Sequence, residues 1–383
     1  MTTDNRKDEL ISRFQETIKG IKETDRIGFL HDADADGICS SVIAAIALER
    51  LHHKKLSLRL FPTNRQVIIQ DKHIQEISDA KIDYFFTFDL SIDQKPENVK
   101  NVEAFSQIIS FDHHQLLADL NSEKTLFLKA HFLYHKDGSR YPTSKLVYDL
   151  FSPLVDISDL DWISCVGLIA DAQYNEWKEF VDSTLRKYHY ELKEQGIDSK
   201  LGEIVSLITA LTISDISLVR EFWDFLLDSN NNENRDIRSV RKRIEETLQS
   251  KYFQYKEAVQ KEVNGWCDFA KNNFEKKEDL YTATIRPKLG VGSVVSTKIS
   301  FLPEHFHHTI IIFVDYGTDM LSANGRRQDC AVKMNELFAQ ACKGLENATG
   351  GGHIPAAGAK FMRKDFEEFK KRVFTLHTEM SKK

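Results

Sequence analysis

The sequence has few helix-breaking residues, few cysteines and no long apolar run. Only 17 of its 383 residues are glycine and 7 are proline, about half the combined share usual in globular proteins, which favours long helices over a turn-rich β fold. The five cysteines are scattered without a CxxC spacing, so we expect reduced thiols rather than disulfides or a zinc site. The longest apolar run, Val42 to Leu48, is far shorter than the ~20 residues that cross a bilayer. With no secretory signal pattern at the N-terminus, we expect a cytoplasmic protein without membrane contact.

The net charge of -6 hides an asymmetry along the chain. Residues 281–383 contain 15 Lys and Arg against 10 Asp and Glu, whereas the residues before them carry an excess of acidic groups. A basic segment in an otherwise acidic protein is compatible with a polyanionic partner that contacts one part of the molecule.

Short apolar runs alternate with helical periodicity in the first half of the chain. Residues 26–31, 56–61, 82–90 and 105–111 have the composition of buried strands, and the pattern of residues 38–51 is that of a crossover helix. This order predicts the α/β class, with a mostly parallel, doubly wound sheet. An amphipathic helix is predicted before it, over residues 7–24.

Strand patterns disappear between residues 178 and 278, where apolar residues recur at helical spacing. The last of these helices is predicted to run without a break from Val240 to Phe274, either straight or bent near Gly265. Beyond it, strands are predicted near 281–285, 309–314, 320–323 and 356–361, with a terminal helix. We therefore predict an α/β domain at 1–177, a helical insert or linker at 178–278 that ends in a long helix, and a smaller α/β domain at 279–383.

Acidic residues follow several of the predicted strands. HDADADG at His31 to Gly37 places Asp32, Asp34 and Asp36 directly after the first one. Ligands of open α/β sheets bind beyond the carboxyl ends of the strands, and clustered carboxylates repel one another unless a cation is present. The motif therefore predicts a metal site, with a simple Asp-rich helix cap as the alternative.

The same arrangement recurs further along the chain. Asp89 ends an apolar run, Asp112, His113 and His114 end the next, and Asp171 ends GLIAD. Hard divalent ions prefer carboxylate oxygens and tolerate imidazole, so Mn²⁺ or Mg²⁺ is the expected metal. A carboxylate beside two imidazoles is available to orient one of them.

Taken in order, the motifs HDADADG, FTFDLS, FDHHQ and GLIADA resemble those of the DHH phosphoesterase superfamily, and TGGGHIPAAGAKF at 349–361 is similar to the motif of its DHH-associated C-terminal domain. The resemblance covers residues 25–175 and 280–383. It implies two divalent ions, with Mn²⁺ favoured and Mg²⁺ as the alternative. Related enzymes have a histidine four residues before the first metal aspartate, whereas His31 stands three before it, so Asp32 is the alternative ligand there. The implied metal ligands are His31, Asp34, Asp36, Asp89, His113 and Asp171.

The resemblance also implies a reacting group and a phosphate-binding surface. The implied catalytic residues are His114, which faces the phosphate, and Asp112. Glycine backbone amides can approach a phosphate in an anion-binding nest, and a guanidinium suits phosphate geometry; which of two adjacent arginines contributes is left open. The implied substrate-binding residues are Ser322, Arg326, Arg327, Gly350, Gly351, Gly352 and His353.

The function that the resemblance implies is that of a RecJ-like exonuclease, of the short archaeal type, acting on single-stranded DNA or RNA. The alternatives are a phosphodiesterase of short oligonucleotides or cyclic dinucleotides, and a non-catalytic scaffold of the replisome type. The helical insert is expected to dock a replication or repair protein. Tyr141 to Ser144 is predicted to cap the helix that follows it; the resemblance implies, as the alternative, a small hydroxyl residue near the substrate there. We assign no function to His305, His307 and His308.

Overall fold

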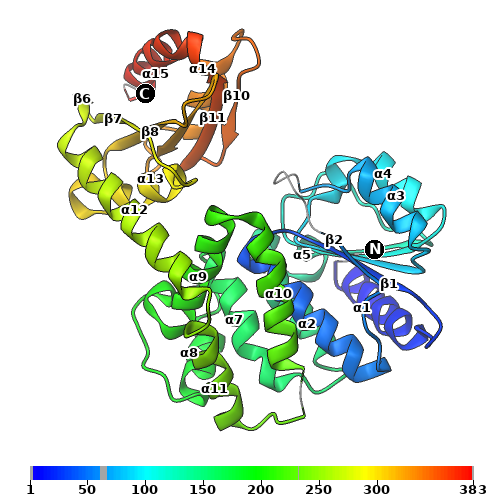
Figure 1. Cartoon of the computed structure of the whole chain (residues 1–383). Coiled ribbons are helices and arrows are strands. Elements are labelled where there is room, and N and C mark those ends of the chain that lie inside the picture. Colours follow the sequence, from blue (N-terminus) through cyan, green and yellow to red (C-terminus); the bar gives the residue numbers. More distant parts are fainter. Residues whose placement is uncertain (1–2, 61–66, 232, 382–383) are drawn as a thin grey trace. The chain divides into compact units, whose positions relative to one another are not determined.

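Two sheets organise the described part of the chain. The computed structural model describes residues 3–60, 67–231 and 233–381, and it divides into one unit of residues 1–253 and another of residues 254–383 (Figure 1). The predicted α/β class is confirmed. The helical stretch predicted at 178–278 is divided between the two units, and most of it belongs to the first.

The first unit is built around a parallel sheet in the order β2-β1-β3-β4-β5. The predicted strands occur at the expected places, although Phe61 at the end of the second lies outside the described residues. The edge strand β5, which ends in a lysine, was not predicted from the sequence. The strands are β1 Ile27–His31, β2 Leu58–Leu60, β3 Tyr84–Phe88, β4 Gln107–Asp112 and β5 Thr125–Lys129.

Helices cover both faces of this sheet, as in a doubly wound fold. On one face, Phe14 of α1 packs edge-on against Phe111 of β4 and Phe151 of α6, with ring centroids 5.7 and 5.1 Å apart. On the other face, α3 and α4 contribute Ile77 and Val99 to a buried apolar cluster. The helices of this part are α1 Thr3–Gly20, α2 Ala35–His52, α3 Asp71–Asp79, α4 Pro96–Glu103, α5 Ala130–Leu133, α6 Thr143–Phe151 and α7 Asp161–Ala170.

The prediction of one unbroken helix from Val240 to Phe274 is wrong, because one helix ends at Leu248 and the next begins at Phe253. At the break, the Ser250 hydroxyl donates to the Thr247 carbonyl at 2.8 Å, a local bond that competes with the helix. Tyr252 is buried against Phe222, which holds the break in place. The helices here are α8 Lys178–Lys187, α9 Lys200–Ser214, α10 Ile216–Asn230, α11 Ile237–Leu248 and α12 Phe253–Asn272.

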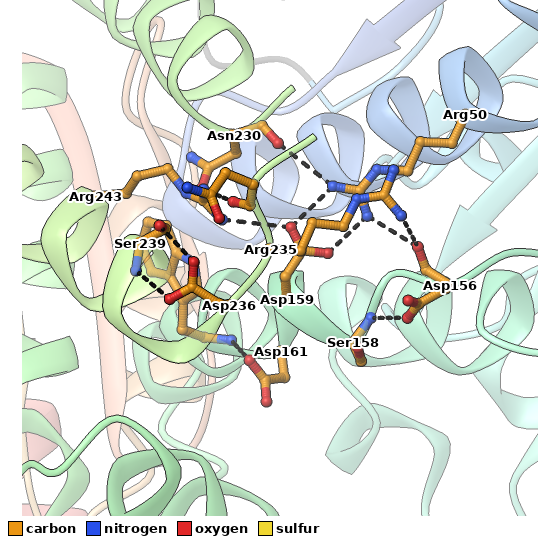
Figure 2. A network of polar contacts seen from close by, with 12 residues as sticks. Arg50, Asp156, Ser158, Asp159, Asp161, Asn230, Arg235, Asp236, Ser239 and Arg243 are labelled. Atoms are coloured by element: carbon orange, nitrogen blue, oxygen red, sulfur yellow. Dashed lines mark hydrogen bonds and ion pairs between the residues drawn. The ribbon is translucent and has the colours of Figure 1, made fainter. Parts of the chain in front are cut away.

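A buried ion-pair network fastens α10 and α11 to the helices of the parallel sheet (Figure 2). Arg50, near the end of α2, donates to both oxygens of Asp159 at 2.7 and 2.9 Å. Arg243 of α11 approaches the same carboxylate at 3.4 Å, and Arg50 also reaches the Asn230 carbonyl at the end of α10. The side chains of the three charged residues are at most 6% exposed.

The second unit contains a mixed sheet in the order β10-β11-β9-β8-β7-β6. Phe361 of β11 and Phe369 of α15 stack with ring centroids 4.1 Å apart in its core. None of the helices in the described part of the chain is long and apolar enough to cross a membrane. The elements are β6 Glu275–Lys277, β7 Leu280–Ile285, α13 Gly292–Ser300, β8 Thr309–Asp315, β9 Met320–Arg326, α14 Met334–Cys342, β10 Thr349–Gly352, β11 Ala356–Met362 and α15 Phe366–Met380.

Candidate active site

The candidate ligands meet at the carboxyl ends of β1, β3 and β4. The chain crosses from β1 to β2 on one side and then to β3 on the other, and such a switch point leaves a crevice beyond the strand ends. Asp32 and Asp34 follow β1, Asp89 follows β3, and His113 follows β4. Asp171 reaches the same place from the end of α7.

Three overlapping groups of side chains lie close enough to hold a metal ion. Within each group, the ligand atoms lie within 4.8 Å of one another. Asp89 and His113 each belong to two of the groups, so the groups form one continuous cluster. The groups are Asp32 with Asp34 and Asp89, Asp36 with His113 and Asp171, and Asp89 with His113 and His114.

The N-terminus of α6 holds two of these carboxylates. The backbone amides of Thr143 and Ser144 donate to the two oxygens of Asp36 at 2.6 and 2.9 Å, as the N-terminus of a helix binds anions. The Thr143 hydroxyl donates to Asp89 at 3.0 Å. The prediction that Tyr141 to Ser144 caps its own helix is therefore wrong, because α6 has no side-chain cap of its own and its free amides bind Asp36 instead.

The backbone of Asp89 is left-handed, with φ at 60°. Residues other than glycine rarely adopt this conformation, and they do so mostly at functional sites. The amide of Asp89 donates to the Phe111 carbonyl at 2.9 Å, which ties the turn after β3 to the end of β4. The turn directs the buried carboxylate of Asp89 into the cluster.

His113 is oriented by a backbone carbonyl. Its Nδ1 lies 3.1 Å from the Ser139 carbonyl oxygen, so Nδ1 carries the proton and donates it there. Its Nε2 lies 2.9 Å from Asp171 Oδ2 and 3.4 Å from Asp89 Oδ1. A hydrogen bond of this kind at one ring nitrogen is typical of histidines that bind metal through the other.

His114 is oriented by Asp112. Oδ1 of Asp112 accepts from the backbone amide of His114 at 3.0 Å and lies 2.7 Å from its Nδ1. Oδ2 of Asp112 pairs with Lys129, and both of these residues are fully buried. Burial raises the pKa of Asp112, but the contacts with His114 and Lys129 hold this pKa below its usual value. Asp112 therefore acts through His114, whose ring is partly exposed.

His31 is not brought into the cluster. Among the described residues, the groups contain Asp32 in its place. His31 is buried, its Nδ1 lies 2.6 Å from the Asp32 carbonyl, and its ring stacks on Trp223 of α10. His31 and Asp32 point in different directions because side chains alternate along β1, so that neighbouring residues lie on opposite sides. Asp34 caps α2, since its Oδ1 accepts from the Gly37 amide at 2.9 Å, and it also belongs to one of the three groups that could hold an ion.

The cluster concentrates negative charge. Loss of hydration and then repulsion from Asp32 raise the pKa of Asp34 to about 8, although part of its side chain faces solvent. Burial and repulsion from Asp171 raise the pKa of Asp36 to about 6, and similar causes raise the pKa of Asp89 well above its usual range. Burial lowers the pKa of His113, but the hydrogen bond to Asp171 and the negative charges of Asp171, Asp36 and Asp112 together outweigh burial and raise the pKa to about 10. A donor set of this kind fits divalent cations.

In the second unit, the two adjacent arginines have different surroundings. Arg327 is buried and paired with the carboxylates of Asp279 and Asp329. Arg326 donates to the hydroxyls of Thr297 at 3.0 Å and Ser293 at 2.9 Å. In the part of the chain that the structure describes, no carboxylate pairs with Arg326, so its charge remains available to an anion. Ser322 lies on the same face of β9 as Arg326.

The three glycines of TGGGH do not form a nest. They lie in the edge strand β10, paired with residues 357–359 of β11. A side chain at Gly350 would meet the Phe338 carbonyl at 2.5 Å, and Gly352 has a φ of 138°. Close packing on α14 explains Gly350, and the turn at His353, which is exposed, explains Gly352, whereas nothing in the described part of the structure requires a glycine at 351. The free edge of β10 still presents backbone amides.

Several supporting residues were missed by the sequence analysis. Ser139 contributes only a backbone carbonyl, and Lys129 ends a strand that was not predicted, so neither has a sequence signal. Gly167 does have a sequence signal, because an isolated glycine inside a helical pattern usually marks a place of close packing. A Cβ atom there would lie 2.6 Å from Asp36 Oδ1, so this glycine lets α7 approach the cluster.

Comparisons with known proteins agree with the fold. Residues 26–172 match the family model described as DHH family, N-terminal domain. RecJ from Thermus thermophilus in complex with Mn²⁺ shares the fold with a TM-score of 0.68 and 16% identity, over 97% of this chain and 54% of that one. This chain thus spans about half of that protein's length.

Two further structures share the fold over nearly their whole length. The DHH domain of a protein described as a member of a family of ribosomal proteins has a TM-score of 0.69 and 15% identity, over 98% of this chain and 92% of that one. An exonuclease RecJ bound to manganese has a TM-score of 0.62 and 16% identity, over 95% and 92%. None of the curated proteins matches this chain in sequence.

Proposed function

Because residues 26–172 of this chain match the model of the DHH family, N-terminal domain, we propose that the protein is a metal-dependent phosphodiesterase, and that it acts as a RecJ-like exonuclease on single-stranded DNA or RNA. The observation that carries the proposal is the cluster of ligand groups that share Asp89 and His113. A protein without a metal would gain nothing from burying like charges side by side at the end of a sheet.

The donor set fits two divalent ions. Asp32 and Asp34 would hold one ion, Asp36 and Asp171 would hold the other together with His113, and Asp89 would bridge them. Mn²⁺ is favoured over Mg²⁺ because an imidazole is among the donors. Two such ions would offset the negative charge of a phosphodiester and would supply a water of lowered pKa as the nucleophile. The N-terminus of α6 and the Ser139 carbonyl keep the ligands in place.

His114 is the proposed catalytic side chain that contacts the phosphate. Its Nδ1 is engaged by Asp112, which leaves Nε2 to donate to a phosphate oxygen or to the leaving group. Asp112 is buried and fixes the orientation of the ring. In this arrangement the substrate does not touch Asp112.

The second unit is proposed to bind the phosphates of the strand. Arg326 supplies a guanidinium without a carboxylate partner among the described residues, and Ser322 and His353 supply further donors. The backbone amides at Gly350 and Gly352, which point away from β11, can add hydrogen bonds along the edge of β10, whereas the amide of Gly351 points toward Gly358 of β11. Arg327 is assigned a structural role here, because its guanidinium already pairs with the carboxylates of Asp279 and Asp329.

End-labelled single strands of DNA and of RNA, incubated with Mn²⁺ or Mg²⁺, test this proposal. We expect the native protein to release mononucleotides and Asp89→Asn to be at least about 100-fold slower. Asparagine tolerates the left-handed backbone at this position, so the variant keeps the turn and loses only the charge. Equal rates for the two proteins would contradict the proposal. Activity confined to strands of about five nucleotides or fewer would replace the exonuclease with an enzyme of short oligonucleotides.

A further inference from the structure

The loop that carries the two histidines is fastened by groups outside the ligand cluster. His113 is bound by the Ser139 carbonyl, and His114 is bound by Asp112. Three residues beyond His114, the Leu117 amide donates to Oδ2 of Asp93 at 2.8 Å. Asp93 lies in the 3₁₀ turn Ile92–Gln94 that follows Asp89.

Lys129 lies at the centre of these contacts. It is the last residue of β5, its side chain is fully buried, and its Nζ pairs with Oδ2 of Asp112 and lies 3.5 Å from Oδ1 of Asp93. The pairing leaves Oδ1 of Asp112 for His114. Both oxygens of Asp112 are therefore engaged, and its carboxylate cannot rotate without breaking a contact on each side.

Packing alone does not explain a lysine at this position. A buried ion pair contributes little to stability compared with apolar residues of similar size, and the neighbouring residues Phe127 and Leu128 are apolar and buried. The specific effect of the ammonium is on the carboxylate that orients His114.

We propose that Lys129, supported by Asp93, is a positioning residue that fixes the ring of His114 through Asp112. The proposal rests on the proposed function, in which His114 contacts the phosphate. Lys129 is too deeply buried to touch substrate, so its effect on the reaction passes entirely through Asp112.

Kinetics of matched variants test the proposal. Lys129→Met keeps the length of the side chain and removes the charge, and we expect kcat to fall about 10- to 100-fold with KM nearly unchanged. Lys129→Arg should recover part of the loss. The control is Lys187→Met, because Lys187 pairs with the buried carboxylate of Asp161 at 2.8 Å on another element. We expect native kinetics from the control, and an equal loss in both methionine variants would overturn the proposal.

A double-mutant cycle separates positioning from general damage. If Lys129 acts through Asp112, the substitution Lys129→Met should cost nothing more in an Asp112→Asn background. Independent, additive losses would overturn the proposal. Should Lys129→Met fail to fold, Asp93→Asn carries the test, since it keeps an acceptor for the Leu117 amide and removes only the charge beside Lys129. An unchanged kcat in that variant would overturn the proposal.

Nitrogen NMR of histidine-labelled protein, with the His114 signals assigned from a His114→Gln variant, tests the geometry without turnover. In the Mg²⁺-loaded native protein we expect a protonated Nδ1 that exchanges slowly, and in Lys129→Met we expect fast exchange at that nitrogen. Identical His114 spectra in the two proteins would overturn the proposal. If the native protein hydrolyses no phosphodiester at all, the proposed function fails, whereas the spectra still decide whether Lys129 positions the ring.

Discussion

At the scale of single residues, the carboxylates at the strand ends compete for protons and for metal. The pKa of Asp36 is raised to about 6 and that of Asp34 to about 8, from an ordinary value of 3.8. The metal-free protein therefore holds protons that the ligands must release when an ion binds. A tight cluster of acids is stable as a metal site and unfavourable without the metal.

We predict that the apparent affinity for Mn²⁺ rises as the pH increases from about 6 to 8, with protons released on binding. The unfolded chain gives up the same protons near pH 4, so the free energy of unfolding of the metal-free protein should fall as the pH rises from about 4 to 8. Calorimetric titrations in two buffers of different ionisation enthalpy, together with urea unfolding at pH 5 and 8, measure both effects. An affinity that does not depend on pH would contradict this account of the cluster.

The two adjacent arginines of the second unit should respond differently to mutation. Arg326→Ala removes a charge that no carboxylate neutralises among the described residues, so we predict a raised KM for single strands at unchanged thermal stability. Arg327→Ala leaves Asp279 and Asp329 without their buried partner, so we predict a loss of about 3 kcal/mol in the free energy of unfolding. Steady-state kinetics and urea unfolding of both variants distinguish these effects, and a reversed pattern would show that Arg327 is the phosphate ligand.

The sequence predicted those candidate residues that can be recognised by their side-chain type and their place after an apolar strand. Asp34, Asp36 and Asp89 were found because acids after apolar strands are conspicuous. Thr143 was misassigned because its partners, Asp36 and Asp89, are far away in the sequence. Asp32 could only be offered as an alternative to His31, since the direction of each side chain depends on the exact end of β1.

At the scale of helices and strands, α2 and α7 connect the ligand cluster to the ion-pair network. Each has a candidate ligand at one end, Asp36 on α2 and Asp171 after α7. At its other end each lies beside the network, since Arg50 is near the end of α2 and Asp159 is in the 3₁₀ turn directly before α7. Gly167 allows their close approach. The network also holds the ends of α10 and α11 (Figure 2).

Breaking this network should destabilise the first unit. Arg50→Met leaves the buried carboxylate of Asp159 with Arg243 alone, so we predict a loss of about 3 kcal/mol in the free energy of unfolding. The double variant Arg50→Met, Asp159→Leu should recover most of it, because no uncompensated charge remains. The control Lys251→Met removes an exposed pair with Glu221 and should change the value by less than about 1 kcal/mol. Urea unfolding measures all three, and a small effect of Arg50→Met would contradict a structural role for the network.

Helices and strands with a clear apolar pattern were predicted, whereas β5, β10 and the break between α11 and α12 were not. The apolar runs that form β1, β3 and β4 indicated the parallel sheet, because strands buried on both faces are continuously apolar. The strand β10 is largely glycine and has no strand propensity of its own. The break between α11 and α12 keeps the helical spacing of apolar residues on both sides, so periodicity alone could not reveal it.

At the scale of the whole molecule, all the candidate metal ligands belong to the unit of residues 1–253. Arg326 and the other proposed phosphate contacts belong to the unit of residues 254–383. The proposed activity therefore involves residues of both units, whereas the proposed metal binding involves residues of the first unit alone.

Scanning calorimetry should show this division. We predict that Mn²⁺ at 100 times its dissociation constant stabilises one unfolding transition, by about 2.7 kcal/mol, and leaves a second transition in place. Asp89→Asn should abolish the shift, and Arg327→Ala should lower only the second transition. An equal shift of both transitions would contradict the assignment of the metal ligands to one unit.

Anomalous scattering from crystals grown with Mn²⁺ is the decisive measurement for the proposed pair of metal ions. We predict two manganese peaks about 3.5 to 4 Å apart, one beside Asp32 and Asp34, the other beside Asp36 and Asp171, with Asp89 between them. Asp89→Asn should lose at least one peak. Crystals in which these carboxylates bind no manganese at millimolar concentration would contradict the account.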